Sequence, residues 1–119
     1  MAPESSDLET NLRHSYPVIA STCLFLVVMA LPAHADDVAV DIKHFTFYPA
    51  SITVPAGTRV VWTNHDDTPH TVVDAAEPKV IRSPPLDTGD SYARLFAAPG
   101  IYDYFCSLHP HMQGTIVVE

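Results

Sequence analysis

The sequence predicts an all-β domain of about six to eight short strands, folded as a β-sandwich or a small barrel. Three observations support this prediction. Residues 36–119 contain short runs of β-branched and aromatic residues, and Pro, Gly and Asp separate these runs at roughly regular intervals. No apolar pattern of helical period extends over a useful length. The chain of 119 residues has room for one domain.

The strands are predicted from apolar alternation, which changes phase once. Residues 38–42 alternate between apolar and other side chains, whereas Phe45 and Phe47 take the opposite parity. A bulge or kink near Lys43 and His44 would account for this change. Further strands are predicted at residues 52–54, 59–64, 70–73, 91–96, 101–105 and 115–118.

The first 35 residues differ from the rest of the chain. An apolar run at residues 18–31 is followed by Ala33-His34-Ala35, which is typical of a secretory signal peptide. We therefore expect residues 1–35 to be cleaved off after Ala35, leaving residues 36–119 as an exported domain. The segment before the apolar run is acidic, where such signals are normally basic. A start codon assigned too far upstream, or incomplete processing that leaves a membrane anchor, would also explain it.

Charge and cysteine content limit the functions that the chain can have. The formal net charge of −8 argues against a nucleic-acid partner. The chain has two cysteines, Cys23 and Cys106, and only Cys106 lies after the expected cleavage point. An exported domain with one thiol forms no internal disulfide, and a bound metal would protect that thiol from oxidation.

Four potential metal ligands follow a recognisable spacing. Cys106, His109 and Met112 form a C-x-x-H-x-x-M motif, and His70 lies upstream within DTPHT. Two imidazoles, one thiolate and one thioether are the donors of a blue-copper site, in which Met is a weak axial ligand. Each residue alone would more often be a loop or core residue, and the joint spacing is what predicts metal.

Several segments in order along the chain resemble the cupredoxins. They are FYP at 47–49, VPAGT at 54–58, VWTN at 61–64, DTPHTV at 67–72 and GIYDYFCSLHP at 100–110. The tight spacing from Cys106 to Met112 resembles that of amicyanin, whereas plastocyanin and pseudoazurin have a longer gap before the Met. The resemblance implies a Greek-key, cupredoxin-like β-sandwich that binds one copper ion, cycling between Cu(I) and Cu(II).

The resemblance also implies roles and partners. His70, Cys106 and His109 would ligate copper in a plane, and Met112 would be axial. The protein would be a periplasmic, monomeric one-electron carrier and not an enzyme, free of the membrane after cleavage. Its redox partners would be a quinoprotein dehydrogenase and a c-type cytochrome.

Residues near these ligands carry further expectations. Asn64 resembles the family position that ties the first ligand loop to the cysteine loop, with Ser107 as its partner. His111 could compete with His109 for copper, but His109 has the family spacing. Asp66 and Asp67 are expected to form a solvated turn. Two histidines are expected at the surface and four aromatic residues in the core: His44 and His65, and Phe45, Phe47, Trp62 and Phe96.

Two other functions remain open from the sequence. A copper-trafficking or sequestering protein could use the same ligands, although such proteins tend to carry extra Met and His clusters. A catalytic copper centre would need a second metal with more histidines than residues 36–119 supply. Zinc is a poorer fit than copper, because Met is a poor zinc ligand.

Overall fold

The computed structural model describes residues 26, 27, 29 and 36–119, and the domain lies in the last of these ranges. The predicted signal peptide and its cleavage point after Ala35 fall, apart from three residues, outside the described part. Among the described residues, no helix has the length and apolarity to cross a membrane.

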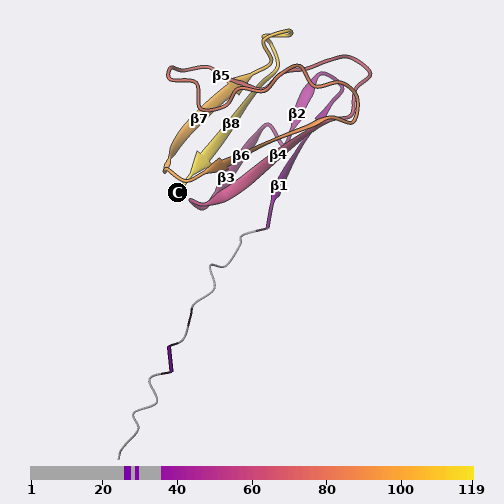
Figure 1. Cartoon of the computed structure of the whole chain (residues 1–119). Coiled ribbons are helices and arrows are strands. Elements are labelled where there is room, and N and C mark those ends of the chain that lie inside the picture. The colour runs from indigo at the N-terminus through magenta and orange to yellow at the C-terminus, as the bar shows by residue number, and fades with distance from the viewer. Residues whose placement is uncertain (1–25, 28, 30–35) are drawn as a thin grey trace, which may run out of the picture. The chain divides into compact units, whose positions relative to one another are not determined.

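The domain consists of two four-stranded sheets, as the sequence predicts (Figure 1). One sheet has the order β2-β1-β4-β6, and the other has the order β3-β8-β7-β5. The strands are β1 Val38–Lys43, β2 Thr46–Tyr48, β3 Ser51–Val54, β4 Thr58–Asn64, β5 Val73–Asp74, β6 Ser91–Phe96, β7 Gly100–Phe105 and β8 Gln113–Val118. From β2 to β7 the strands alternate between the two sheets, whereas β1–β2 and β7–β8 are hairpins within one sheet. As a result β1 pairs parallel with β4, and β3 pairs parallel with β8.

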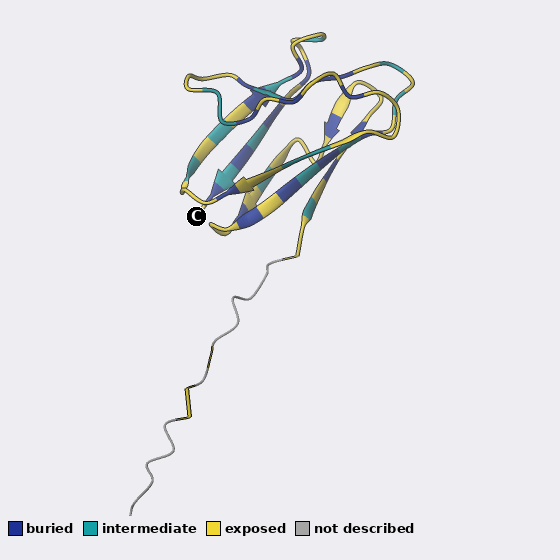
Figure 2. Ribbon diagram, viewed as in Figure 1, coloured by how far each residue is buried: buried dark blue, intermediate teal, exposed yellow. Residues whose placement is uncertain are grey.

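The core lies between the two sheets, and more buried residues alternate with more exposed ones along most of the strands (Figure 2). The strand β4 shows the pattern most clearly, because Val60, Trp62 and Asn64 are buried while their neighbours are not. Trp62 from one sheet packs against Tyr104 from the other, with ring centroids 5.4 Å apart. Three of the four aromatic residues expected in the core, Phe47, Trp62 and Phe96, are at most 1% exposed.

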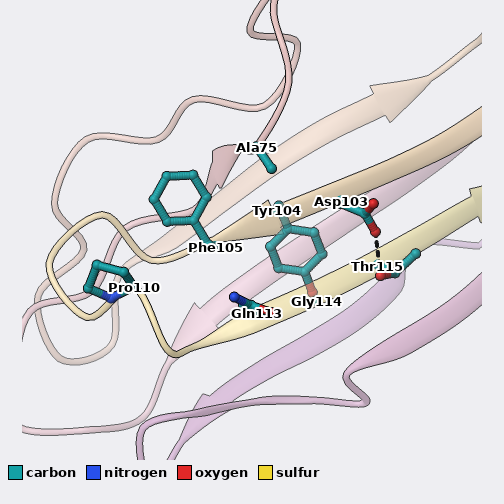
Figure 3. A pocket seen from close by; sticks show the side chains of 8 residues that line it. All are labelled: Ala75, Asp103, Tyr104, Phe105, Pro110, Gln113, Gly114 and Thr115. Carbon is teal, nitrogen blue, oxygen red and sulfur yellow. Dashed lines mark hydrogen bonds between the residues drawn. The ribbon is translucent and has the colours of Figure 1, made fainter.

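Space between the sheets is tight beside Tyr104. Gly114 on β8 faces this ring, and a Cβ placed on Gly114 would come within 2.2 Å of Cζ (Figure 3). The glycine is therefore required by packing and not by an unusual backbone angle.

The change of phase after β1 is a sharp two-residue turn. Lys43 pairs with Thr46, so His44 and Phe45 alone connect β1 to β2. Both have positive φ, 53° and 54°, which confirms the predicted kink. The prediction that Phe45 lies in the core is wrong: its exposed fraction is 41%. A residue at the tip of a hairpin lies beyond the sheets that would cover it.

The predicted strand at residues 70–73 is only partly present. His70 forms an isolated bridge with Leu86, and β5 begins at Val73. The backbone between them is bonded to side chains, because the amide of Thr71 donates to Cys106 Sγ and that of Val72 to Ser83 Oγ. Donors used in this way cannot form a regular ladder.

Candidate metal centre

The predicted metal ligands converge at one end of the sandwich. Cys106 follows β7, and His109 and Met112 lie in the loop before β8, at the end of this hairpin away from the C-terminus (Figure 1). His70 comes from the long connection between β4 and β5. One donor atom from each of His70, Cys106 and His109 lies within 4.8 Å of the others.

Backbone hydrogen bonds hold the Cys106–Met112 loop in a tight shape. The amide of His109 donates to the carbonyl of Cys106 at 3.1 Å, and the amide of Met112 donates to the carbonyl of His109 at 2.8 Å. The amide of Cys106 donates back to the carbonyl of Met112 at 3.1 Å. The loop therefore brings the residues at spacings of three and six to the same place.

The distances between donor atoms fit a trigonal metal site. Cys106 Sγ lies 3.8 Å from His70 Nδ1 and 3.7 Å from His109 Nδ1. Bond lengths of about 2.3 Å to sulfur and about 2.0 Å to nitrogen place two ligand atoms about 3.7 Å apart at a trigonal angle and about 3.5 Å apart at a tetrahedral one. The observed separations of 3.8 and 3.7 Å are those expected of donors that share one metal ion, and they are compatible with the trigonal plane of a blue-copper site.

The four residues differ in their access to solvent. His70 and Cys106 are fully buried and Met112 is 2% exposed, whereas His109 is half-buried. Electrons would therefore enter and leave a metal at this site most directly through the His109 ring.

Two donors on Thr71 face the cysteine sulfur. The Thr71 amide donates to Cys106 Sγ at 3.3 Å, and the Thr71 hydroxyl lies 3.7 Å from it. Hydrogen bonds of this kind hold a ligating sulfur in place and tune the metal that it binds. The hydroxyl also accepts from the Ser107 amide at 2.7 Å and bonds the Ser107 hydroxyl at 2.7 Å.

Thr71, and not Asn64, joins the two ligand loops, which corrects the expected role of Asn64. The side-chain NH2 group of Asn64 donates to the carbonyls of Thr68 and Leu86, and the side-chain oxygen of Asn64 accepts from the backbone amide of Asp66. Asn64 is fully buried and shapes the His70 loop from within. Thr71, which follows His70 in the sequence, is the residue that bonds Ser107, and sequence spacing alone does not reveal this.

Asp66 orients the His70 ring, so the expectation of a solvated turn is wrong for this residue. Its Oδ2 lies 2.8 Å from His70 Nε2, and its side chain is only 11% exposed. Its carboxylate also accepts from the amides of His44 and Phe45. Desolvation opposes ionisation, but the Phe45 amide, the His70 ring and the His44 amide together hold the pKa of Asp66 below its usual value. The four-residue spacing of Asp66 and His70 was the available signal.

The other histidines do not join the donor cluster in the described part of the chain. His44 is exposed, and His65 pairs with Asp41 at 2.9 Å on the surface. His111 is exposed as well, with its ring 6.4 Å from that of His109. A groove of about 510 Å³ over β7 and β8 is lined by Pro110 of the ligand loop but by none of the donors (Figure 3).

The donor set therefore suits a copper ion. A buried thiolate and thioether favour Cu(I), and the two imidazoles suit Cu(II). The family profile of the cupredoxin-like domain matches residues 17–118.

The chain belongs to the cupredoxin family.

Individual relatives agree with this assignment. Amicyanin-alpha of Methylorubrum extorquens is 38% identical over 90 residues, which cover 73% of this chain and 76% of that protein. The chloroplast plastocyanin of Tetradesmus obliquus is 34% identical over 104 residues, covering 76% and 72%. A solved Cu(I) form of an amicyanin variant superposes with a TM-score of 0.65 at 32% identity, covering 71% of this chain and 85% of that one.

This cupredoxin is thus a type 1 copper protein similar to amicyanin and plastocyanin, which are electron carriers and not enzymes. Its cofactor is one copper ion.

Proposed function

We propose that this cupredoxin carries single electrons between redox proteins, with copper held by His70, Cys106 and His109 in a plane and by Met112 as an axial ligand. The observation that carries the proposal is the set of donor separations, 3.8 and 3.7 Å from Cys106 Sγ to the two Nδ1 atoms. Among these ligands, only His109 extends from the buried cluster toward the surface.

Bound copper supplies the one-electron chemistry, and the protein holds the ligands still while the charge changes. His70 is held by Asp66 on the side opposite to the metal site, and Cys106 is held by Thr71. His109 and Met112 are bonded to each other and to Cys106 through the loop backbone. Ligands fixed in this way need little rearrangement when an electron arrives or leaves, which favours rapid transfer.

An apolar surface around His109 would allow brief contact with redox partners. Leu108 is 51% exposed, and Pro69 and Pro110 are also exposed. Small apolar contacts of this kind are typical of redox encounters, which must dissociate quickly. By its similarity to amicyanin, we propose a quinoprotein dehydrogenase as donor, a c-type cytochrome as acceptor and a monomeric carrier.

We also propose that the protein works in the periplasm after cleavage following Ala35. The apolar run and the A-x-A sequence before Asp36 support export. The intact mass of the exported protein tests this proposal, because it should correspond to a chain beginning at Asp36. A mass that includes residues 1–35 would contradict it.

Electron transfer with retention of copper tests the proposed function. The copper-loaded, reduced protein is mixed with an oxidised c-type cytochrome, and the haem spectrum and the copper content are followed together. We expect the cytochrome to gain one electron per copper while the copper-to-protein ratio stays at one. Loss of copper during the cycle, without reduction of the cytochrome, would contradict the proposal and favour copper delivery.

A further inference from the structure

Three aromatic rings meet at the metal centre, and one of them is not a ligand. The Phe45 ring lies 5.1 Å from the His70 ring and 5.1 Å from the His109 ring, edge-on to both at 90° and 88°. The two imidazoles are themselves 5.0 Å apart. Phe45 therefore contacts both histidines of the proposed copper plane from the solvent side, with 41% of its own surface exposed.

The turn that presents Phe45 is an unfavourable place for a bulky residue. A two-residue hairpin with positive φ at both positions strongly prefers Asn-Gly, because residues with a large side chain are strained there. This chain has His44 and Phe45 at φ of 53° and 54°. Because the turn lies beside the candidate metal centre and does not have the residues that such a turn prefers, we infer that the Phe45 side chain itself has a role there.

A single carboxylate couples this turn to the metal centre. Asp66 Oδ1 accepts from the His44 amide at 2.8 Å, and Oδ2 accepts from the Phe45 amide at 3.0 Å. The same Oδ2 lies 2.8 Å from His70 Nε2. The Asp66 carboxylate thus holds the His70 ring and also holds the turn that places Phe45 against the His109 ring.

The two histidines differ in how they are oriented. The ring nitrogen of His70 that faces away from Cys106 is bonded to a carboxylate, the usual arrangement for a metal-binding histidine. No such bond is made by His109 Nε2 to any residue of the described range 36–119, where its ring is bonded only to Cys106 through Nδ1. Contacts with neighbouring rings are what restrains His109 on this side, and Phe45 makes the closest of these from outside the ligand set.

We propose that Phe45 is a positioning residue of the copper centre, whose ring orients the His109 imidazole in place of a hydrogen bond. The Asp66 carboxylate and the His44–Phe45 turn hold the ring where it does this. The inference rests on the proposed function only in taking His109 as a copper ligand.

Three variants of the full chain test the proposal. Phe45→Leu keeps an apolar side chain but removes the ring, and Phe45→Tyr keeps the ring and should behave as the unaltered protein. Tyr48→Leu is the matched control, because Tyr48 is an aromatic residue of the same hairpin that is 63% exposed. Amide spectra of all three establish that they are folded.

The first readout is imidazole NMR relaxation of the metal-free protein. We expect Phe45→Leu to increase exchange broadening of the His109 ring signals about threefold or more, while the His70 ring, held by Asp66, is unchanged. The second readout is copper transfer to a chelator. Release should be about tenfold faster in Phe45→Leu, since an edge-on aromatic contact contributes about this factor.

Equal His109 relaxation in Phe45→Leu and in the unaltered protein would overturn the proposal. So would broadening of both rings together, because that would show collapse of the turn and not a selective effect on His109. Failure of Phe45→Tyr to restore the original behaviour would also contradict it. If the unaltered protein forms no blue copper site, the proposed function fails, but the metal-free NMR comparison still decides the role of Phe45.

Discussion

Thr71 joins the metal centre to its surroundings through both its amide and its side chain. Its amide supports the Cys106 sulfur, and its hydroxyl bonds both the amide and the hydroxyl of Ser107. The amide bond is independent of the Thr71 side chain, but the link between the two ligand loops depends on the hydroxyl. The two contributions can therefore be separated by substitution.

Thr71→Val removes the hydroxyl and keeps the shape and the backbone amide. We expect the free energy of unfolding of the metal-free protein to fall by about 1–3 kcal/mol, because the part-buried Ser107 amide loses its acceptor. Urea denaturation measures this change. Thr71→Ser keeps the hydroxyl and should be nearly neutral, so an equal loss in both variants would contradict the role assigned to the hydroxyl.

Tyr104 makes stability depend on pH in the alkaline range. Burial between the sheets raises the pKa of Tyr104 to about 12 from 10.0. The unfolded chain therefore loses this proton first as pH rises, so stability is complete below about pH 10 and is lost progressively toward about pH 12. Two pH units correspond to about 3 kcal/mol.

Denaturation of Tyr104→Phe between these pH values isolates the effect. The difference in unfolding free energy between Tyr104→Phe and the unaltered protein should shift by about 3 kcal/mol in favour of the variant as pH rises through this window. A constant difference across the window would show that the Tyr104 phenol ionises normally in the folded protein.

The proposed ligands could be named from the sequence because copper chemistry requires particular residue types at a particular spacing, and the structure brings donor atoms of His70, Cys106 and His109 together. The role of Phe45 could not be predicted, because it depends on a turn that brings the β1–β2 hairpin onto the His70 loop. For Asp66 the only sequence signal was its spacing of four residues from His70. Phe45 has the apolar aromatic side chain of a typical core residue, and the tight turn with positive φ values is what places it at the surface. Residues that position a ligand are harder to identify from the sequence than the residues that would bind the metal.

Among the elements, the β7–β8 hairpin carries three of the four proposed ligands and depends on a close contact. Gly114 faces Tyr104, and a Cβ there would lie 2.2 Å from Cζ and 2.4 Å from the hydroxyl oxygen of the ring. The ring is held by Trp62 and Phe47, so it has little freedom to move aside.

Gly114→Ala should therefore destabilise the domain by about 1–3 kcal/mol through overpacking. Urea denaturation of the metal-free protein measures this loss. In a Tyr104→Leu background the same substitution should cost much less, because the obstructing ring is gone. Equal costs in the two backgrounds would mean that the contact with Tyr104 is not the cause.

At the same scale, strands that alternate cleanly in sequence are present in the structure. Residues 70–72 form no regular strand, because hydrogen bonds to the side chains of Cys106 and Ser83 replace the ladder, and β5 begins only at Val73. Local β propensity in this segment is thus overridden by hydrogen bonds to two side chains, one of which is the candidate ligand Cys106. The two deviations from the predicted elements, at Phe45 and at residues 70–72, both lie next to the candidate metal centre.

At the scale of the whole molecule, we expect one end of the sandwich to dock redox partners and the other end not to. Leu108 is 51% exposed beside His109, whereas Ile101 is 72% exposed at the start of β7, where it pairs with Val117 near the C-terminus. Partner docking should therefore depend on the apolar surface around Leu108 and not on the equally apolar residue at the other end.

Leu108→Glu should lower the second-order rate of electron transfer to a c-type cytochrome about tenfold, because a charge replaces an apolar contact at the centre of a small interface. Stopped-flow mixing at fixed ionic strength measures the rate. Ile101→Glu adds the same charge at the opposite end and should leave the rate nearly unchanged. Similar slowing in both variants would indicate an effect of net charge and not of docking.

We expect one copper ion to bind through the Cys106 thiolate in a trigonal site. The most direct test is the visible absorption and EPR spectrum of residues 36–119 after addition of one equivalent of Cu(II). We expect intense thiolate-to-copper absorption and a narrow copper hyperfine splitting, both lost in Cys106→Ser. A pale protein with ordinary copper EPR would contradict the claim, because the thiolate would then not be a strong ligand.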